Sequence, residues 1–233
     1  MNSYLEFNKN YYDRGYEADN VESYVFRAYG RIFKHDLGLD GSSSERVLDF
    51  GCGQGAAVRF LSSKGFDAYG VDISERDLRK ARELSPEISD RFAEIDPKPV
   101  ESDMFFGGGF DLIISIQTLY FLSDTDLEIR LRSLHNMLKP GGYIYASMMG
   151  TRAYFANFAT PADDGMSKID FANDRITYKD FFVNLTESSQ DLEQKFHLFD
   201  KVYVGYYDRD YRNEGSEFHY TFTGRKTTWT SSF

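Results

Sequence analysis

The sequence predicts a doubly wound α/β fold, with a mostly parallel sheet, helices on both faces and an antiparallel strand near the C-terminus. Strand-like apolar runs alternate with helix-like stretches up to residue 149, which is typical of a parallel sheet with crossover helices. Residues 110–116 (FDLIISI) are almost continuously apolar, as in a central strand covered on both faces. A glycine-rich turn at residues 51–55 (GCGQG) joins a strand to a helix.

Apolar spacing, caps and breakers place the elements in order along the chain. We expect helices over residues 21–37, 56–64, 74–84, 125–138 and 186–196. We expect strands over residues 46–50, 66–71, 91–95, 110–116, 143–149, 199–207 and 217–224. Ser74 is a good N-cap, and Gly65 and Pro86 end helical patterns. The run KPGG at residues 139–142 predicts a helix stop and a turn, and the last two strands predict an antiparallel hairpin at one sheet edge.

Charge and cysteine content restrict the partners and the location. The formal net charge of −10 disfavours nucleic acid and anionic membranes, because both would repel the protein at long range. The single cysteine, Cys52, excludes a disulfide within the chain and favours a reducing, cytoplasmic location. The scattered histidines lack ligand spacing, so we expect no metal site. We find neither a signal-peptide pattern nor an apolar run long enough to span a bilayer.

The glycine-rich turn is a candidate ligand-binding loop. Glycines permit positive φ angles and close backbone approach, and the start of the next helix offers unpaired N–H groups. Asp72 ends the second strand, 17 residues after Gly55, where a carboxylate can accept hydrogen bonds from two ribose hydroxyls. Each feature also has a structural interpretation, as a tight turn or as a charge at a helix N-terminus.

The glycine spacing and Asp49 indicate which ligand the loop prefers. The turn reads Gly-x-Gly-x-Gly, whereas dinucleotide-binding enzymes carry Gly-x-Gly-x-x-Gly. Asp49, two residues before the first glycine, would repel a pyrophosphate but suits a cationic group. S-adenosylmethionine has a ribose, an amino group and a sulfonium and no phosphate, so the loop favours it over NAD.

Four motifs occur in order: VLDFGCGQG at residues 47–55, GVDIS at 70–74, FDLI at 110–113 and LKPGG at 138–142. Together the four motifs resemble those of class I S-adenosylmethionine-dependent methyltransferases of the small bacterial type, whose sheet is Rossmann-like. The similar region runs from residue 46 to residue 149, close to half of the chain.

The resemblance implies how the methionine part of the cofactor is held. Asp49, Gly51 and Gly53 would bind this part, and Gln117 lies where the family's chain passes it. S-adenosylhomocysteine would be the product.

The resemblance also implies how the nucleoside part is held. Asp72 would bind the ribose hydroxyls, and Ile73 would pack on the adenine. Asp96 falls near the family's acidic residue at the adenine amino group, and Ile95 or Phe92 could serve in its place.

The length of 233 residues fits one methyltransferase domain. Within it we expect an N-terminal arm and helix at residues 1–40 and a cofactor-binding core at 46–149. We expect a polar, irregular insertion at 151–185 to cover the substrate as a lid.

The acceptor pocket is expected at the carboxyl ends of the strands. Residues with suitable side chains there, or in the N-terminal arm, are Tyr11, Tyr12, Tyr120, Arg152 and Tyr154. Packing in the core or on the surface is the alternative for each tyrosine, and a surface charge is the alternative for Arg152. His219, in the last predicted strand, and His135, near a helix C-terminus, are interpreted as structural, so no catalytic base is assigned.

The sequence therefore predicts methyl transfer to an O or N atom of a small molecule, such as a metabolite or a surface-sugar precursor. In-line displacement at an activated carbon needs alignment, exclusion of water and at times removal of a proton, but no metal. The alternatives are a non-catalytic module that binds S-adenosylmethionine, a methyltransferase acting on protein or RNA, and an NAD-dependent oxidoreductase, which the glycine spacing disfavours.

Overall fold

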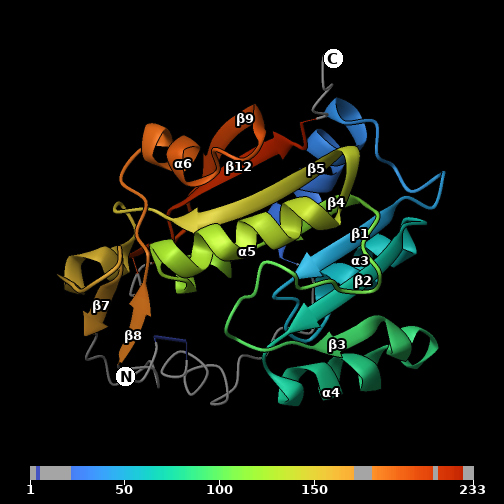
Figure 1. Ribbon diagram of the computed structural model, residues 1–233, viewed down its shortest axis with the longest axis horizontal. Coiled ribbons are helices and arrows are strands. Elements are labelled where there is room, and N and C mark those ends of the chain that lie inside the picture. The colour runs from blue at the N-terminus through green and yellow to red at the C-terminus, as the bar shows by residue number, and fades with distance from the viewer. Residues whose placement is uncertain (1–3, 6–21, 171–179, 212–214, 228–233) are drawn as a thin grey trace.

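The computed structural model describes residues 4–5, 22–170, 180–211 and 215–227, shown in Figure 1. The helical elements are α2 (Ser23–Ala28), η1 (Tyr29–Asp36), α3 (Ala56–Ser63), α4 (Glu75–Leu84), η2 (Pro86–Arg91), η3 (Leu119–Phe121), α5 (Asp124–Met137), η4 (Tyr154–Phe158) and α6 (Ser189–Lys195). The strands are β1 (Arg46–Phe50), β2 (Asp67–Asp72), β3 (Phe92–Glu94), β4 (Phe110–Ser115), β5 (Leu138–Met149), β6 (Ala159–Pro161), β7 (Ser167–Asp170), β8 (Asp180–Val183), β9 (Asp200–Tyr207), β10 (Asp210–Tyr211), β11 (Gly215–Ser216) and β12 (His219–Arg225).

Within these ranges, seven strands form one sheet in the order β3-β2-β1-β4-β5-β12-β9 (Figure 1). The first five strands in this order, from β3 through β2, β1 and β4 to β5, each run parallel to their neighbours. Strand β12 is antiparallel to both β5 and β9. The order reverses at β1, which lies between β2 and β4. Ligands of open α/β sheets bind outside the carboxyl ends of the strands at such a reversal. The predicted fold class is confirmed, including the antiparallel C-terminal hairpin.

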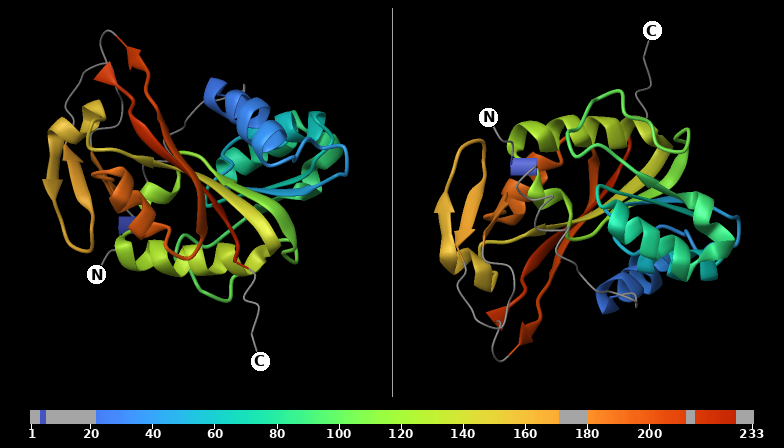
Figure 2. Two further views of the ribbon diagram at one scale, coloured as in Figure 1. Left: turned by 90° about the horizontal axis from the view of Figure 1, so that it is seen from above. Right: turned by 90° about the horizontal axis from the view of Figure 1, so that it is seen from below.

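Helices cover both faces of the sheet, as the two views of Figure 2 show, with α2–η1 and α3 on one side and α5 and α6 on the other. Two hydrophobic cores correspond to these layers. Val47 of β1 packs in the core that contains Leu61 of α3. The next residue, Leu48, packs in the opposite core with Leu131 of α5. Successive strand residues point to opposite faces, so a central strand needs apolar residues on both.

Two predicted segments differ from the structure. Residues 139–142 do not form a separate turn, because β5 begins at Leu138, directly after α5 ends. Gly141, with φ of 78°, lies inside β5, and the pairing of β4 with β5 shifts register at this end of the two strands. The predicted start of this strand, residue 143, is therefore wrong.

The second difference concerns the segment after β5, where the sequence predicts irregular chain. Strands β6, β7 and β8 instead form an antiparallel sheet of their own. A further short pair, β10 with β11, lies in the connection from β9 to β12. The division into arm, core and lid stays a prediction.

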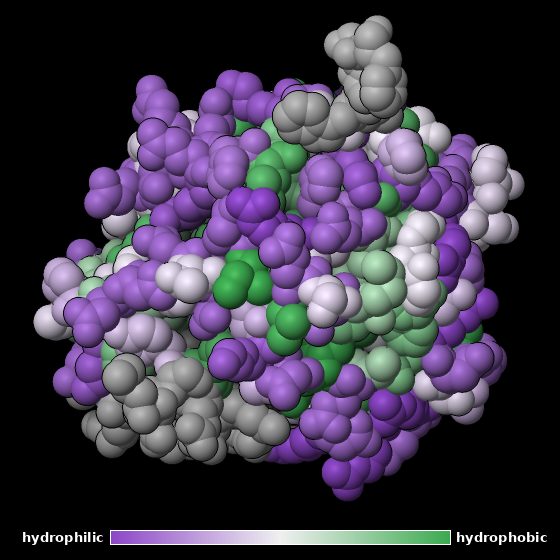
Figure 3. Space-filling view, viewed as in Figure 1, coloured by the Kyte–Doolittle hydropathy of each residue, from purple (hydrophilic) through white to green (hydrophobic). Residues whose placement is uncertain are grey.

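Polar side chains dominate the face of the molecule seen in Figure 3, where hydrophobic ones form small patches near the centre. In the part of the chain that the structure describes, no helix is long and apolar enough to cross a membrane.

Candidate functional site

The loop between β1 and α3 is held against β2 by its own backbone. The N–H groups of Gly51 and Cys52 both donate to the carbonyl of Val71, at 2.8 and 3.0 Å. Gly51, Gly53 and Gly55 have φ angles of 81°, 50° and 76°. These left-handed conformations strain residues with a side chain, so the three glycines follow from the path of the loop.

The space around each glycine differs. A Cβ atom on Gly51 would overlap the side chain of Thr118, and one on Gly55 would lie 2.7 Å from the ring of Phe92. A Cβ on Gly53 would have no atom within 4 Å. Gly51 and Gly55 are therefore required by packing within the protein, whereas Gly53 borders open space.

Asp72, the last residue of β2, links the loop after β1 to the loop after β2. Its Oδ2 accepts from the N–H of Gly53 at 2.8 Å, and its Oδ1 accepts from the N–H of Ser74 at 2.9 Å. Burial is the larger effect and raises the pKa of Asp72 to about 6, although the two hydrogen bonds lower it in part. Each carboxylate oxygen keeps accepting capacity for a further donor.

Ser74 is the N-cap of α4, as predicted, and its hydroxyl accepts from the N–H of Asp77 at 3.3 Å. The same hydroxyl donates to the Asp77 carboxylate, which also accepts from the Gln54 side chain at 3.1 Å. The start of α4 is thus fastened to the glycine-rich loop by side chains as well as by Asp72.

Asp49 lies at the end of β1 and is 5% exposed. Among the described residues, no hydrogen bond or ion pair holds its carboxylate. Burial, followed by the negative charge of Asp72, raises the pKa of Asp49 to about 8. A buried carboxylate without a partner is costly, and a cationic ligand group would relieve that cost.

Gln117 follows β4 at the reversal of the sheet, with a φ of 54° that is unusual for a residue with a side chain. Its backbone N–H donates to the hydroxyl of Ser147 at 2.8 Å. Its side-chain amide donates to Oε1 of Glu217 at 2.6 Å and to the Tyr207 hydroxyl at 3.2 Å. Strained backbone held by several contacts is common at functional sites.

Glu217 is in turn bound by Arg209, whose Nε lies 2.6 Å from Oε2. Arg209 also pairs with Glu22 at 2.7 Å and lies over the ring of Tyr24. We call the residues connected in this way the Tyr207 cluster: Glu22, Tyr24, Gln117, Ser147, Tyr207, Arg209 and Glu217. The cluster connects the start of α2 to the loop after β4 and to the hairpin of β9 and β12.

The other predicted cofactor residues have weaker connections. Ile73 is half-buried between β2 and α4. Asp96 is exposed, and its carboxylate accepts from the N–H of Lys98 at 2.8 Å. Ile95, the alternative to Asp96, donates its N–H to the carbonyl of Asp72 at 3.0 Å. The roles of these residues stay predictions.

The predicted acceptor residues are spread over two regions. Tyr11 and Tyr12 lie outside the described residues. Tyr120 is buried beside the ring of His219, with centroids 5.5 Å apart. Arg152 is exposed and lies over the ring of Phe218 at 4.2 Å, and Tyr154 is half-buried against Gly215.

Sequence reasoning identified Gln117 but missed the other members of the Tyr207 cluster. Gln117 and Glu217 are 100 residues apart, and Ser147 and Tyr207 look like ordinary strand residues. The sequence shows only that Ser147 and Tyr207 are polar residues inside predicted strands. That signal does not reveal which residues they contact. Pairing of β12 between β5 and β9 is what brings them together.

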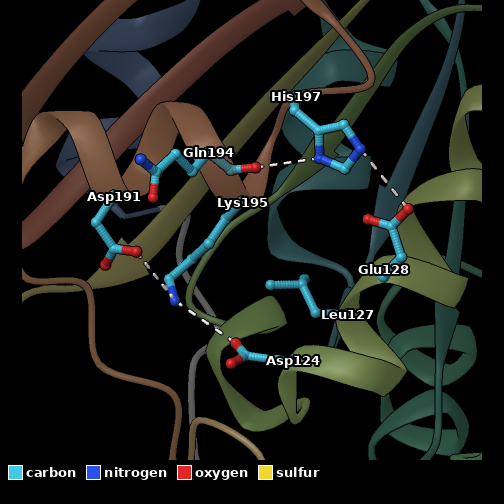
Figure 4. Close-up of a pocket in the computed structure, with 7 residues that line it drawn as sticks. All are labelled: Asp124, Leu127, Glu128, Asp191, Gln194, Lys195 and His197. Carbon is cyan, nitrogen blue, oxygen red and sulfur yellow. Dashed lines mark hydrogen bonds and ion pairs between the residues drawn. The ribbon is translucent and has the colours of Figure 1, made fainter.

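A separate pocket lies between α5 and α6 and is lined by charged residues that pair with one another (Figure 4). Lys195 lies 3.4 Å from Asp191 and 3.6 Å from Asp124, and His197 lies 3.8 Å from Glu128. Because these charged side chains already pair with one another, the pocket does not need a ligand to balance their charges. Across the described ranges, no group of three or more His, Cys, Asp or Glu residues is arranged to hold a metal ion.

Comparisons with known proteins agree with this architecture. A family described as "Methyltransferase domain" matches residues 21–186. Ubiquinone biosynthesis O-methyltransferase of Pseudomonas aeruginosa is 28% identical over 109 residues, which cover 46% of this chain and 45% of that protein. The chain therefore aligns with less than half the length of this relative.

Two solved structures share the fold over nearly the whole chain. Magnesium protoporphyrin IX methyltransferase from Synechocystis PCC 6803, with bound S-adenosylhomocysteine, has a TM-score of 0.64 at 14% identity, covering 97% of this chain and 100% of that one. The N-methyltransferase NodS from Bradyrhizobium japonicum, also with S-adenosylhomocysteine, has a TM-score of 0.62 at 14% identity, again covering 97% and 100%.

Gly51→Ala should destabilise the protein more than Gly53→Ala. Both residues have positive φ angles, which cost about 1 kcal/mol for alanine, but only the new Cβ at position 51 overlaps Thr118. Overpacking adds about 2 kcal/mol, so we expect losses of about 3 and 1 kcal/mol in urea unfolding. Equal losses would contradict the different surroundings of the two glycines.

Asp49→Asn should make the protein more stable at neutral pH. The folded-state pKa of about 8 lies above the ordinary aspartate pKa of 3.8, so the stability that protonated Asp49 contributes is present below pH 4 and is lost as pH rises toward 8. Asparagine does not ionise, and we expect it to be on the order of 5 kcal/mol more stable than wild type at pH 7.5 and equal to it near pH 4.

Urea unfolding at pH 4, 6 and 7.5 measures this dependence. Asp90→Asn, on the surface, is the control. Its free energy of unfolding should differ from that of wild type by the same amount at all three pH values. Loss of stability in Asp49→Asn at pH 7.5 would mean that the Asp49 carboxylate is paired in the folded protein.

Proposed function

This chain belongs to the class I S-adenosylmethionine-dependent methyltransferases, and from that premise we propose that it transfers a methyl group to an O or N atom of a small molecule. The observation that carries the proposal is the buried Asp49 carboxylate without a cationic partner, next to a glycine that borders open space. The amino group of S-adenosylmethionine supplies a cation for Asp49, and the open side of Gly53 leaves room for the ligand.

The remaining residues of the loop region fit the nucleoside. Asp72 is held by two backbone N–H groups, so its carboxylate is fixed in place to accept from ribose hydroxyls. Ile73 offers an apolar side chain to the adenine. Asp96 and Ile95 lie at the end of β3 and are the candidates for the far edge of the base.

When bound, S-adenosylmethionine supplies a methyl carbon that its sulfonium activates for displacement. The chain must align the acceptor with that carbon and exclude water. Asp49 orients the ligand through its charge, and Gln117 fixes the loop after β4 beside it through Ser147, Tyr207 and Glu217. Because Gln117 is held by three hydrogen bonds to residues of β5, β9 and the connection before β12, this side of the site is rigid.

Several features support a small acceptor. The net charge of −10 disfavours RNA, and the relatives named above carry names of small-molecule methyltransferases. We propose Tyr11, Tyr12, Tyr120, Arg152 and Tyr154 as the acceptor-binding residues, and residues 151–185 as the segment that covers the acceptor. A metabolite or a surface-sugar precursor is the proposed class. The cytoplasmic location stays a prediction.

Two alternatives remain within the family: a module that binds S-adenosylmethionine without turnover, and a methyltransferase acting on protein or RNA. The first predicts binding without release of S-adenosylhomocysteine. The second predicts turnover with macromolecular acceptors alone. Release of S-adenosylhomocysteine across a panel of small molecules, peptides and RNA therefore separates the three.

Thermal unfolding with added ligand tests the binding claim. At 100 times its dissociation constant, S-adenosylmethionine or S-adenosylhomocysteine should stabilise the protein by about 2.7 kcal/mol, or roughly 5–10 °C in Tm, whereas NAD should have no effect. Gly53→Ala should weaken binding at least about tenfold, because its Cβ enters the open space, and it should remain folded. A shift with NAD alone, or with none of the three ligands, would refute the proposal.

A further inference from the structure

His219 occupies the same edge of the sheet as the candidate site. It is the first residue of β12 and pairs with Met149, the last residue of β5, and with Tyr207 of β9. Since β5 is parallel to β4 and β1, this end of β5 lies at the carboxyl edge where the glycine-rich loop and Gln117 also lie. The side chain is 1% exposed.

The hydrogen bonds of the ring define its tautomer. Nδ1 lies 3.1 Å from the carbonyl oxygen of Glu217. A carbonyl only accepts, so Nδ1 carries the proton and Nε2 carries a lone pair. Within the described residues, buried Nε2 has no hydrogen-bond partner. Most buried polar atoms are paired, so an unpaired one in a folded protein calls for an explanation.

The surroundings of the ring do not supply that partner. The Tyr207 ring stacks on His219, with centroids 5.0 Å apart and planes 16° apart, and Tyr120 packs near it at 5.5 Å. The Tyr207 hydroxyl is already engaged by Gln117 and Ser147. The aromatic neighbours therefore hold the ring in place without pairing Nε2.

Burial and the charged groups near the ring keep the imidazole unprotonated at neutral pH. Burial lowers the pKa of His219 to about 4, and Arg209 adds to this, whereas the carbonyl of Glu217 and the charge of Asp208 act in the opposite direction. The Glu217 carboxylate itself is paired with Arg209 and Gln117. At neutral pH the ring is therefore neutral, and Nε2 keeps an available lone pair.

We propose that Nε2 of His219 accepts the proton of a hydroxyl group on the methyl acceptor, which makes the acceptor a neutral, hydroxyl-bearing small molecule. This inference rests on the proposed function and specifies its acceptor. A lone pair needs an O–H or N–H donor, and an amine attacks through its own lone pair without first losing a proton. A carboxylate brings no proton for Nε2 to accept.

In this transfer the O–H bond of the acceptor breaks and its proton goes to Nε2. The oxygen then bonds to the methyl carbon as the bond between that carbon and sulfur breaks. The sulfur keeps that electron pair. The positive charge moves from the sulfonium to the imidazolium, which then releases the proton to water.

Nitrogen NMR of the histidine rings tests the site without turnover. The protein is saturated with S-adenosylhomocysteine and titrated with phenol, or with toluene as the matched probe without a hydroxyl. His219→Gln assigns the resonance. We expect protonated Nδ1, unprotonated Nε2 and a shift of Nε2 with phenol alone. Protonated Nε2, or the same response to both probes, overturns the proposal.

Turnover across the acceptor panel provides the second test. His219→Asn keeps a donor for the Glu217 carbonyl and removes Nε2, so we expect at least about a 100-fold loss of kcat with hydroxyl acceptors. The loss should shrink to a few-fold for acceptors whose hydroxyl ionises below the assay pH, which a structural role would not cause. His35→Asn, on the surface, is the control and should behave as wild type.

The two proposals fail separately. If S-adenosylhomocysteine does not raise Tm, the proposed function fails. If it raises Tm in wild type and in His219→Asn alike, yet the variant turns over hydroxyl acceptors at the wild-type rate, only the role of His219 fails. Wild-type turnover with amines alone also overturns the role of His219.

Discussion

The structure of the candidate site depends on two buried carboxylates that lie close enough for their charges to repel. Asp49 and Asp72 are 5% and 9% exposed, and each belongs to a strand that ends at the reversal of the sheet. Asp72 is stabilised there by the N–H groups of Gly53 and Ser74, which orient the loops after β1 and β2 around it. Asp49 has no such donor, so burial keeps its carboxyl largely protonated until a cationic ligand group can balance the charge.

The same constraint explains the backbone of the loop. Gly53 must direct its N–H toward Asp72 while the chain returns to start α3, and a φ of 50° achieves this. Gly51 must pass close to Thr118, so its lack of a side chain is a packing requirement. Binding and stability thus make different demands on two glycines that look alike in the sequence.

The other half of the site is built by long-range pairing. Gln117 is fixed by Ser147, Tyr207 and Glu217, which come from β5, β9 and the residues just before β12. The antiparallel hairpin that closes the sheet therefore also positions the loop after β4. His219 stands in this hairpin, between the ring of Tyr207 and that of Tyr120.

The sequence predicts the parallel part of the fold well, because glycine-rich turns, caps and apolar runs are local signals. The cap by Ser74 and the strand over residues 110–115 are examples. Prediction fails at residues 139–142, where α5 passes directly into β5, and at β6 and β7, whose short polar strands carry no apolar alternation. His219 is interpreted from the sequence as structural because a lone histidine does not reveal whether its second nitrogen has a partner.

The central claim is that Asp49 becomes charged when its ligand binds. Calorimetric titration with S-adenosylmethionine at pH 6.5, in two buffers that differ in ionisation enthalpy, counts the protons released. Because the pKa of Asp49 is about 8 without a ligand, wild type should release roughly one proton on binding, and Asp49→Asn should release almost none. Binding by wild type without proton release, or equal release by the variant, would contradict the account.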